Sequence, residues 1–229
     1  MNDSARIRRD LAAAALVLTS LLGLVSVALQ PDFPAGHAAR LAAIDHAGTT
    51  AVVSAVAFLL QQLPFIVAML GLGHLLRSST PRLSTTGVLL GCVGAFGHTV
   101  FAGMSMVYLL MATDASHRRE FGALYARIES SPVMLFALLG LAGTVFGLLL
   151  MAVALFRTRV VPLWVPGLLV AFLVLEFAGS AVSTYASELA SACFLVAFGA
   201  LAVHLHRMPV DAWRAPAPAA RALTDVPIS

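Results

Sequence analysis

The stretch that decides the fold runs from Gly87 to Ala112 and reads GVLLGCVGAFGHTVFAGMSMVYLLMA, without one charged side chain. A helix of this length crosses a bilayer with some tilt. At about 100° per residue, one face of that helix carries only small residues and one imidazole. These are Gly87, Gly91, Gly94, His98, Ala102 and Ser105. Small residues let helices approach closely in lipid, so we expect this helix to be central, with His98 turned toward the protein.

The composition of the whole chain also indicates a membrane protein. Of its 229 residues, 60% are apolar and only 11% are charged, which excludes an ordinary soluble domain. All 14 basic residues are arginines in short loops, so the net charge of +3 does not indicate nucleic acid. The lysine-free, Ala-, Gly- and Arg-rich composition suggests a bacterial genome of high GC content. Cys92 and Cys193 lie within apolar runs, which argues against a disulfide framework or a CxxC site.

Five further apolar runs accompany the central one. The predicted spans cover residues 11–29, 50–76, 87–112, 133–156, 163–183 and 187–206. We therefore expect an all-α, polytopic six-helix bundle over residues 11–206, after a short basic segment, 1–10, and before a Pro/Ala-rich disordered tail, 207–229. A signal peptide cleaved after Ala28 is the alternative for the first run, although that run exceeds the usual apolar length of a signal peptide.

The arginines predict the orientation of the bundle. With a cytoplasmic N-terminus, ten arginines adjoin the cytoplasmic ends of the spans and four adjoin the other ends, as the positive-inside rule requires. An even number of spans independently places both termini on one side. We expect both termini in the cytoplasm and the protein in the cell (plasma) membrane.

The longest loop, residues 113–131, contains a second helical pattern. Phe121, Leu124, Tyr125 and Ile128 repeat at i, i+3, i+4 and i+7, which predicts an amphipathic helix. That helix either rests on the membrane surface or covers a cavity. Residues 37–46 are expected to form another short surface helix.

Residues 147–172 read GLLLMAVALFRTRVVPLWVPGLLVAF: a helix that ends in an aromatic residue and arginine, a short turn, and a proline-bearing start of the next helix. This hairpin resembles that of uncharacterised multi-spanning bacterial membrane proteins, of actinobacterial type. The family has no assigned activity, so the resemblance implies a topology and no catalytic residue.

Polar residues near the expected midplane are the candidates for a functional site. They are Thr19, Ser20, Gln61, Gln62, His98, Thr144 and Glu176. Glu176 is the strongest, because a carboxylate at the centre of a membrane helix costs about 2.5–3.5 kcal/mol on insertion scales and usually has a partner inside the protein. Glu176 and His98 lie at depths about one helical turn apart, which predicts one shared interior site.

Three further residues complete the predicted site. Ser180 continues the polar face beyond Glu176 toward the outer surface, and Gln61 and Tyr108 are added as ligand-binding or proton-handling candidates. A structural role is the alternative: a neutral carboxyl bonded to a neighbouring helix, and an imidazole that donates to a carbonyl. Gln61 and Gln62 point about 100° apart, so one of them can instead bond a carbonyl freed by the helix break at Pro64.

Three functions remain open from the sequence. The first is a protein that binds or transports a small molecule, a lipid or a proton at this intramembrane site. The second is an accessory subunit whose glycine seam packs against a partner membrane protein. The third is a haem redox protein that uses His74 with His204 or His206, but no ligand spacing supports it, and we expect no cofactor and no metal. Known catalytic motifs such as HExxH and GxSxG are absent from the sequence, which argues against an ordinary enzyme and leaves open a membrane-embedded acid/base enzyme that uses Glu176 and His98.

Overall fold

The computed structural model describes residues 2–179 and 185–214 of the chain, and their regular secondary structure is helical. The helices are α1 (Asn2–Ala28), α2 (His37–Ala47), α3 (Thr49–Leu76), α4 (Pro81–Ala112), α5 (Arg118–Glu129), α6 (Met134–Thr158), α7 (Trp164–Phe177), α8 (Ala186–Arg207) and α9 (Val210–Arg214). Five of them, α1, α3, α4, α6 and α8, are long and apolar enough to cross a membrane. The chain therefore has the architecture of an all-α, polytopic membrane protein.

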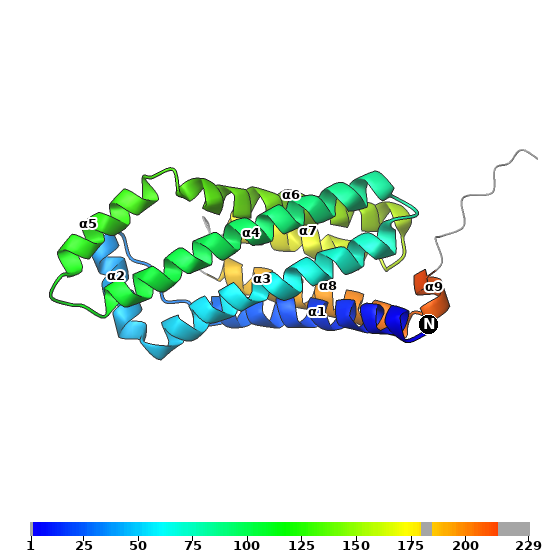
Figure 1. Cartoon of the computed structure of the whole chain (residues 1–229), viewed down its shortest axis with the longest axis horizontal. Helices are drawn as coiled ribbons and strands as arrows, with labels where there is room; N and C mark the ends of the chain where they lie inside the picture. Colours follow the sequence, from blue (N-terminus) through cyan, green and yellow to red (C-terminus); the bar gives the residue numbers. More distant parts are fainter. Residues whose placement is uncertain (1, 180–184, 215–229) are drawn as a thin grey trace, which may run out of the picture.

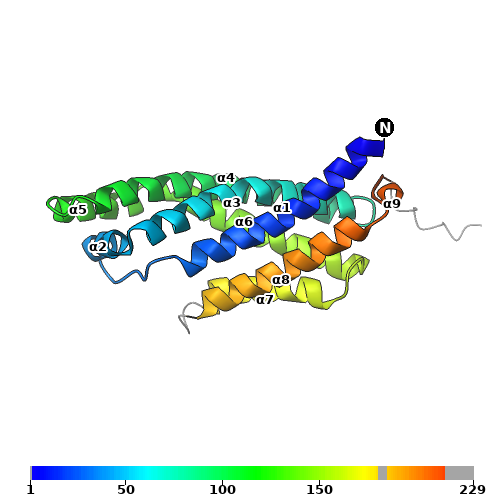
Figure 2. The ribbon, with the colours of Figure 1, turned by 90° about the horizontal axis from the view of Figure 1, so that it is seen from below.

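Figure 1 shows which helices run along the long axis of the molecule: α1, α3, α4, α6, α7 and α8. Each of them is antiparallel to the next in this order. α2 and α5 lie together at one end, whereas the N-terminus and α9 lie at the other. Figure 2 shows α7 and α8 as a pair that lies beside α1. The connections are short, so successive helices must return along the bundle.

Two boundaries differ from those expected. α7 covers 14 residues, fewer than the expected span of 163–183, and residues 180–184 lie outside the described ranges. The tail expected to be disordered begins with α9 instead. The Trp213 side chain on α9 is buried, and its ring lies 4.2 Å from the ring of His74. The buried Trp213 ring thus fixes α9, the helix within this tail, to α3.

α4 and α6 form the most extensive contact among the described helices. We call this contact the seam; its glycines are Gly87, Gly91, Gly94 and Gly97 of α4 and Gly140, Gly143 and Gly147 of α6. A methyl group on Gly94 would lie 2.5 Å from the backbone nitrogen of Thr144, and one on Gly143 would lie 2.5 Å from that of Gly94. No side chain fits there, so the two backbones touch, as close helix packing in lipid requires.

The outer surface of the bundle is apolar. Leu63 on α3 is 68% exposed and Leu110 on α4 is 74% exposed, while Leu16, Leu72 and Phe198 are fully buried where α1 packs against α3 and α8. Apolar side chains on both the inside and the outside are typical of helices surrounded by lipid rather than water.

At one end of the bundle, α2 and α5 pack against each other, and we call this pair the cap. A methyl group on Gly122 of α5 would lie 3.0 Å from the backbone nitrogen of Ala38 of α2. Tyr125 of α5 stacks on Tyr108 of α4, with ring centroids 3.9 Å apart. The predicted amphipathic helix is therefore present, and its buried tyrosine holds the cap to the bundle.

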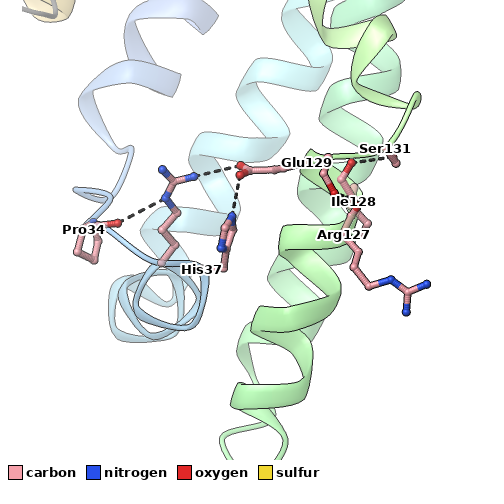
Figure 3. A network of polar contacts seen from close by, with 8 residues as sticks. Pro34, His37, Arg127, Ile128, Glu129 and Ser131 are labelled. Carbon is pink, nitrogen blue, oxygen red and sulfur yellow. Dashed lines mark hydrogen bonds and ion pairs between the residues drawn. The ribbon is translucent and has the colours of Figure 1, made fainter.

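Ion pairs join the two helices of the cap at their polar edge. Figure 3 shows Glu129 of α5 reaching His37 of α2, with 2.8 Å between Oε2 and Nε2. The other carboxylate oxygen lies 3.1 Å from Nη1 of Arg40. A third pair connects Arg118 to Asp45 at 2.6 Å. The cap is thus fixed by charges at its water-exposed edge and by apolar contacts beneath.

Candidate functional site

A cavity of about 180 Å³ lies inside the bundle, and we call it the central cavity. Each of the six helices that run along the bundle contributes to its wall. One polar residue from each is Ser26 (α1), Gln61 (α3), His98 (α4), Thr144 (α6), Glu176 (α7) and Ser191 (α8). Residues that are far apart in sequence are therefore brought to one place by the antiparallel arrangement.

The structure brings together three of the five site residues expected from the sequence. Glu176, His98 and Gln61 all line the central cavity. Tyr108 lines a neighbouring cavity instead, and Ser180 lies outside the described residues. The depth of each residue along its helix, which can be counted in the sequence, was the signal that predicted these three residues to lie together.

Glu176 lies one residue before the end of α7 and presents its carboxyl to the bundle interior. Its Oε2 atom is buried, and no hydrogen-bond partner for it exists among the described residues. The carboxyl of Glu188, in the first turn of α8, is close enough to act on it electrostatically, and that charge has the same sign. A buried polar atom without a partner is costly, so this oxygen gains from a donor that the described chain does not supply.

His98 is positioned by the seam. Its Nδ1 lies 3.5 Å from Oγ1 of Thr144, a distance at the limit of a hydrogen bond. A methyl group on Gly140 would lie 2.5 Å from its Cδ2, so a glycine on α6 makes room for the imidazole. The His98 ring also packs against Phe58, with centroids 5.5 Å apart. Within the described chain no hydrogen bond joins His98 to Glu176; the two share a cavity without direct bonding.

The two glutamines differ in their contacts, although both line the central cavity. Gln62 is buried, and its amide donates to the backbone oxygen of Phe58 at 2.8 Å. That carbonyl is not the one freed by Pro64, which is the carbonyl of Leu60 four residues before the proline. Gln61 directs its amide toward α1, where a methyl group on Gly23 would lie 3.0 Å from Nε2. Unlike Gln62, Gln61 makes no side-chain hydrogen bond within the described residues.

A second cavity, of about 210 Å³, lies beneath the cap, and we call it the cap cavity. Tyr108 and Tyr125 line it, and the Oη atom of Tyr108 is buried without a hydrogen-bond partner in the described ranges. Burial raises the pKa of the Tyr125 phenol, which keeps it neutral. Ser26 and Phe58 line both cavities, so the two are adjacent. Phe58 lies in an apolar run, and nothing in the sequence marks it as a cavity residue.

The histidines near the other end of the bundle have separate surroundings. Nε2 of His74 lies 2.9 Å from the backbone oxygen of Trp213, and Nδ1 of His206 lies 3.5 Å from Asp10. His204 lines a groove at the end of α8. Across residues 2–179 and 185–214, no three His, Cys, Asp or Glu side chains are grouped so as to hold a metal ion.

Comparison of the chain with models of known protein families, with curated proteins and with solved structures finds no match. The hairpin over residues 147–172 therefore identifies no family. The architecture and the two cavities carry the functional argument, and both belong to an all-helical chain with five candidate membrane spans.

Proposed function

We propose that the protein binds or transports a small cationic molecule or a proton at the central cavity. The observation that carries this proposal is the buried, unpartnered Oε2 atom of Glu176 in a cavity walled by six helices. Ionisable residues inside membrane proteins usually serve a substrate or ion pathway. His98 and Gln61 offer the ligand further polar contacts on the same cavity wall.

The chemistry of the cavity wall favours a cation. Its other side chains are largely aromatic: Phe58, Phe65, Phe172, Phe177 and Phe194. Ring faces and a carboxyl both attract positive charge, and among the described residues no arginine lines the cavity. One water molecule needs about 10–15 Å³ of such a volume, so a space of about 180 Å³ accommodates a small organic cation or several waters.

The accessory-subunit alternative depends on a glycine face that is free to bind a partner. Gly94 and Gly97 instead meet the backbone of α6, and Gly91 meets the side chain of Met69 on α3 as well as α6. Because these surfaces are already used within the chain, the seam supports internal packing, and the cavity hypothesis is the better supported of the two.

We further propose six spans with both termini in the cytoplasm. α7 is antiparallel to α6 and α8 (Figure 1), and the helix ends that carry most arginines lie with the N-terminus. Reporter fusions at Ser116 and at the C-terminus should therefore report opposite sides of the membrane; the same side for both would contradict the topology. An intact mass that lacks the first 28 residues would contradict an uncleaved first span.

The binding proposal is tested with Glu176→Gln and Glu176→Leu. Calorimetry on purified protein with small primary to quaternary ammonium ions should show binding that Glu176→Gln weakens at least about tenfold, as loss of one buried charge contact predicts. Proton uptake by proteoliposomes tests the proton variant of the proposal; His98 on α4 and Glu188 on α8 are the other titratable groups near this carboxyl.

Glu188→Gln is the matched control, because Glu188 is a nearby carboxyl that does not line the central cavity. It should change ammonium binding and proton uptake far less than Glu176→Gln does, because Glu188 acts on the Glu176 carboxyl only electrostatically. If Glu176 is only structural, Glu176→Gln will be silent, Glu176→Leu will lower the melting temperature, and no ammonium ion or proton will be bound. That outcome would refute the proposal.

A further inference from the structure

A groove of about 790 Å³ lies at the arginine-rich end of the bundle, apart from both cavities. It is formed by the turn between α6 and α7, the start of α7 and the second half of α8. Its lining includes Val161, Trp164, Val165, Val203, His204 and Arg207, none of which lines the central cavity or the cap cavity. Figure 1 places this end beside α9 and the N-terminus.

One wall of the groove is apolar and open. Val161 and Val165 come from the α7 side and Val203 from α8. A methyl group added to Gly199, on the same wall, would meet no atom of another described helix within 4 Å, so α8 leaves space there. Trp164 is 52% exposed, and tryptophan at a helix end is typical of the level of the lipid headgroups. The wall is thus suited to an acyl chain.

The rim of the groove carries uncompensated positive charge. Arg207 is exposed, and within the described residues its side chain makes no hydrogen bond or ion pair. The same holds for the side chains of Arg157, in the last turn of α6, and Arg159, which follows that helix. Two acidic side chains at this end have other partners: Asp10 pairs with Arg9 at 2.8 Å and Asp211 with Arg214 at 3.7 Å. A guanidinium binds a phosphate through two parallel hydrogen bonds.

We propose that this groove binds an anionic phospholipid, with its phosphate at Arg207 and an acyl chain along the apolar wall between α7 and α8. Basic pockets between membrane helices bind anionic headgroups by the same combination of charge and apolar contact. The inference is independent of the function proposed for the central cavity, since no residue is shared.

Trp164 supplies a direct readout of lipid in the groove. Trp213 is the other tryptophan, and Trp213→Phe keeps the backbone oxygen that His74 binds, so this background isolates Trp164. The protein is reconstituted in phosphatidylcholine vesicles that contain either brominated phosphatidylglycerol or brominated phosphatidylcholine. Bromine quenches tryptophan on contact, and we expect phosphatidylglycerol to be preferred about fivefold, the attraction expected of one arginine near the surface.

Two pairs of variants test the assignment. Arg207→Gln should remove the preference, whereas Arg82→Gln should keep it, because Arg82 is exposed at the same end but outside the groove. Gly199→Leu should fill the groove and reduce quenching by both lipids. Gly167→Leu should not, since Gly167 also has free space around it but does not line the groove.

Any one of three results would overturn the proposal. The first is equal quenching by the two brominated lipids when the groove is unsubstituted, and the second is an equal loss of preference in Arg207→Gln and Arg82→Gln. The third is unchanged quenching in Gly199→Leu with its melting temperature preserved. The second result would assign the preference to the surface charge of this end as a whole.

Discussion

The seam and the cap join pairs of helices by different means. In the seam, glycines bring the backbones of α4 and α6 into contact, and the Thr144 side chain packs directly against Gly94. In the cap, α2 and α5 are joined by the ion pairs of Glu129 and Arg118 above stacked tyrosines. Inside a bilayer, close packing must replace the hydrophobic effect. At the water-exposed end, charges contribute, although each exposed pair is worth little.

The largest effect is expected when the seam is forced apart. Gly94→Leu places a branched side chain where Thr144 nitrogen already lies 2.5 Å from an added methyl group. Backbone cannot move aside as a side chain can, so α4 and α6 must separate. We expect a loss of about 3 kcal/mol or more, the upper end for overpacking, measured as a lower melting temperature in detergent.

Two control positions on α4 lie outside the seam, and a third, Gly91, lies within it but faces a side chain. Gly103→Leu should be nearly neutral, since a methyl group there would meet no atom of another described helix within 4 Å. Val93→Leu should be mild because Val93 is exposed. Gly91→Ala should cost less than Gly94→Ala: its methyl group meets the mobile end of Met69 at 2.6 Å rather than backbone. Equal stability of all these variants would show that the seam does not determine packing.

The close packing of the seam was largely predictable from the sequence; for the cap, the two helices were predictable but their pairing was not. Glycine spacing on a helix of known pitch fixes which face packs closely, and depth along each helix grouped Glu176, His98 and Gln61. The partners of the cap, such as Glu129 and His37, are 92 residues apart, and nothing in either local sequence specifies the other. Likewise, the bond from Gln62 to the Phe58 oxygen depends on a rotamer that helical periodicity does not determine.

A smaller effect is expected from Glu129→Ala, which removes the carboxylate shared by His37 and Arg40. Both contacts are about one-third exposed, so we expect a loss of about 0.5–1 kcal/mol. It should show as faster hydrogen exchange in α2 and α5, with exchange at the seam unchanged.

Arg127→Gln is the control for this cap variant. Arg127 is on the same helix and close in sequence to Glu129, but Figure 3 shows its side chain pointing away from His37. Hydrogen exchange in α2 and α5 of this variant should be nearly as slow as in the unsubstituted protein. If Glu129→Ala and Arg127→Gln accelerated exchange equally, the shared carboxylate would not be what joins α2 to α5.

The smallest effect expected is a change in the stability of the turn that leads into α5 of the cap as the pH changes. Hydrogen bonds from Ser116 and then His117 lower the pKa of Asp114 to about 2, and the same carboxylate raises the pKa of His117 above 6.5. The contribution of Asp114 is present above pH 3.8 and is lost as pH falls toward about 2. The contribution of His117 is present below pH 6.5 and is lost as pH rises through its raised pKa.

The turn should therefore be most stable between pH 3.8 and 6.5 and should loosen above that range. An NMR titration of isotope-labelled His117 measures this directly. Asp114→Asn should return the His117 midpoint toward 6.5, the ordinary value, because it removes both the hydrogen-bonded carboxylate and its charge. Glu120→Gln should lower the midpoint less, since Glu120 acts on His117 only through its charge and is the weakest of the contributing groups. If Asp114→Asn left the His117 midpoint unmoved, Asp114 and His117 would not form a bonded pair in this turn. Any effect of pH on the cap would then come from other groups.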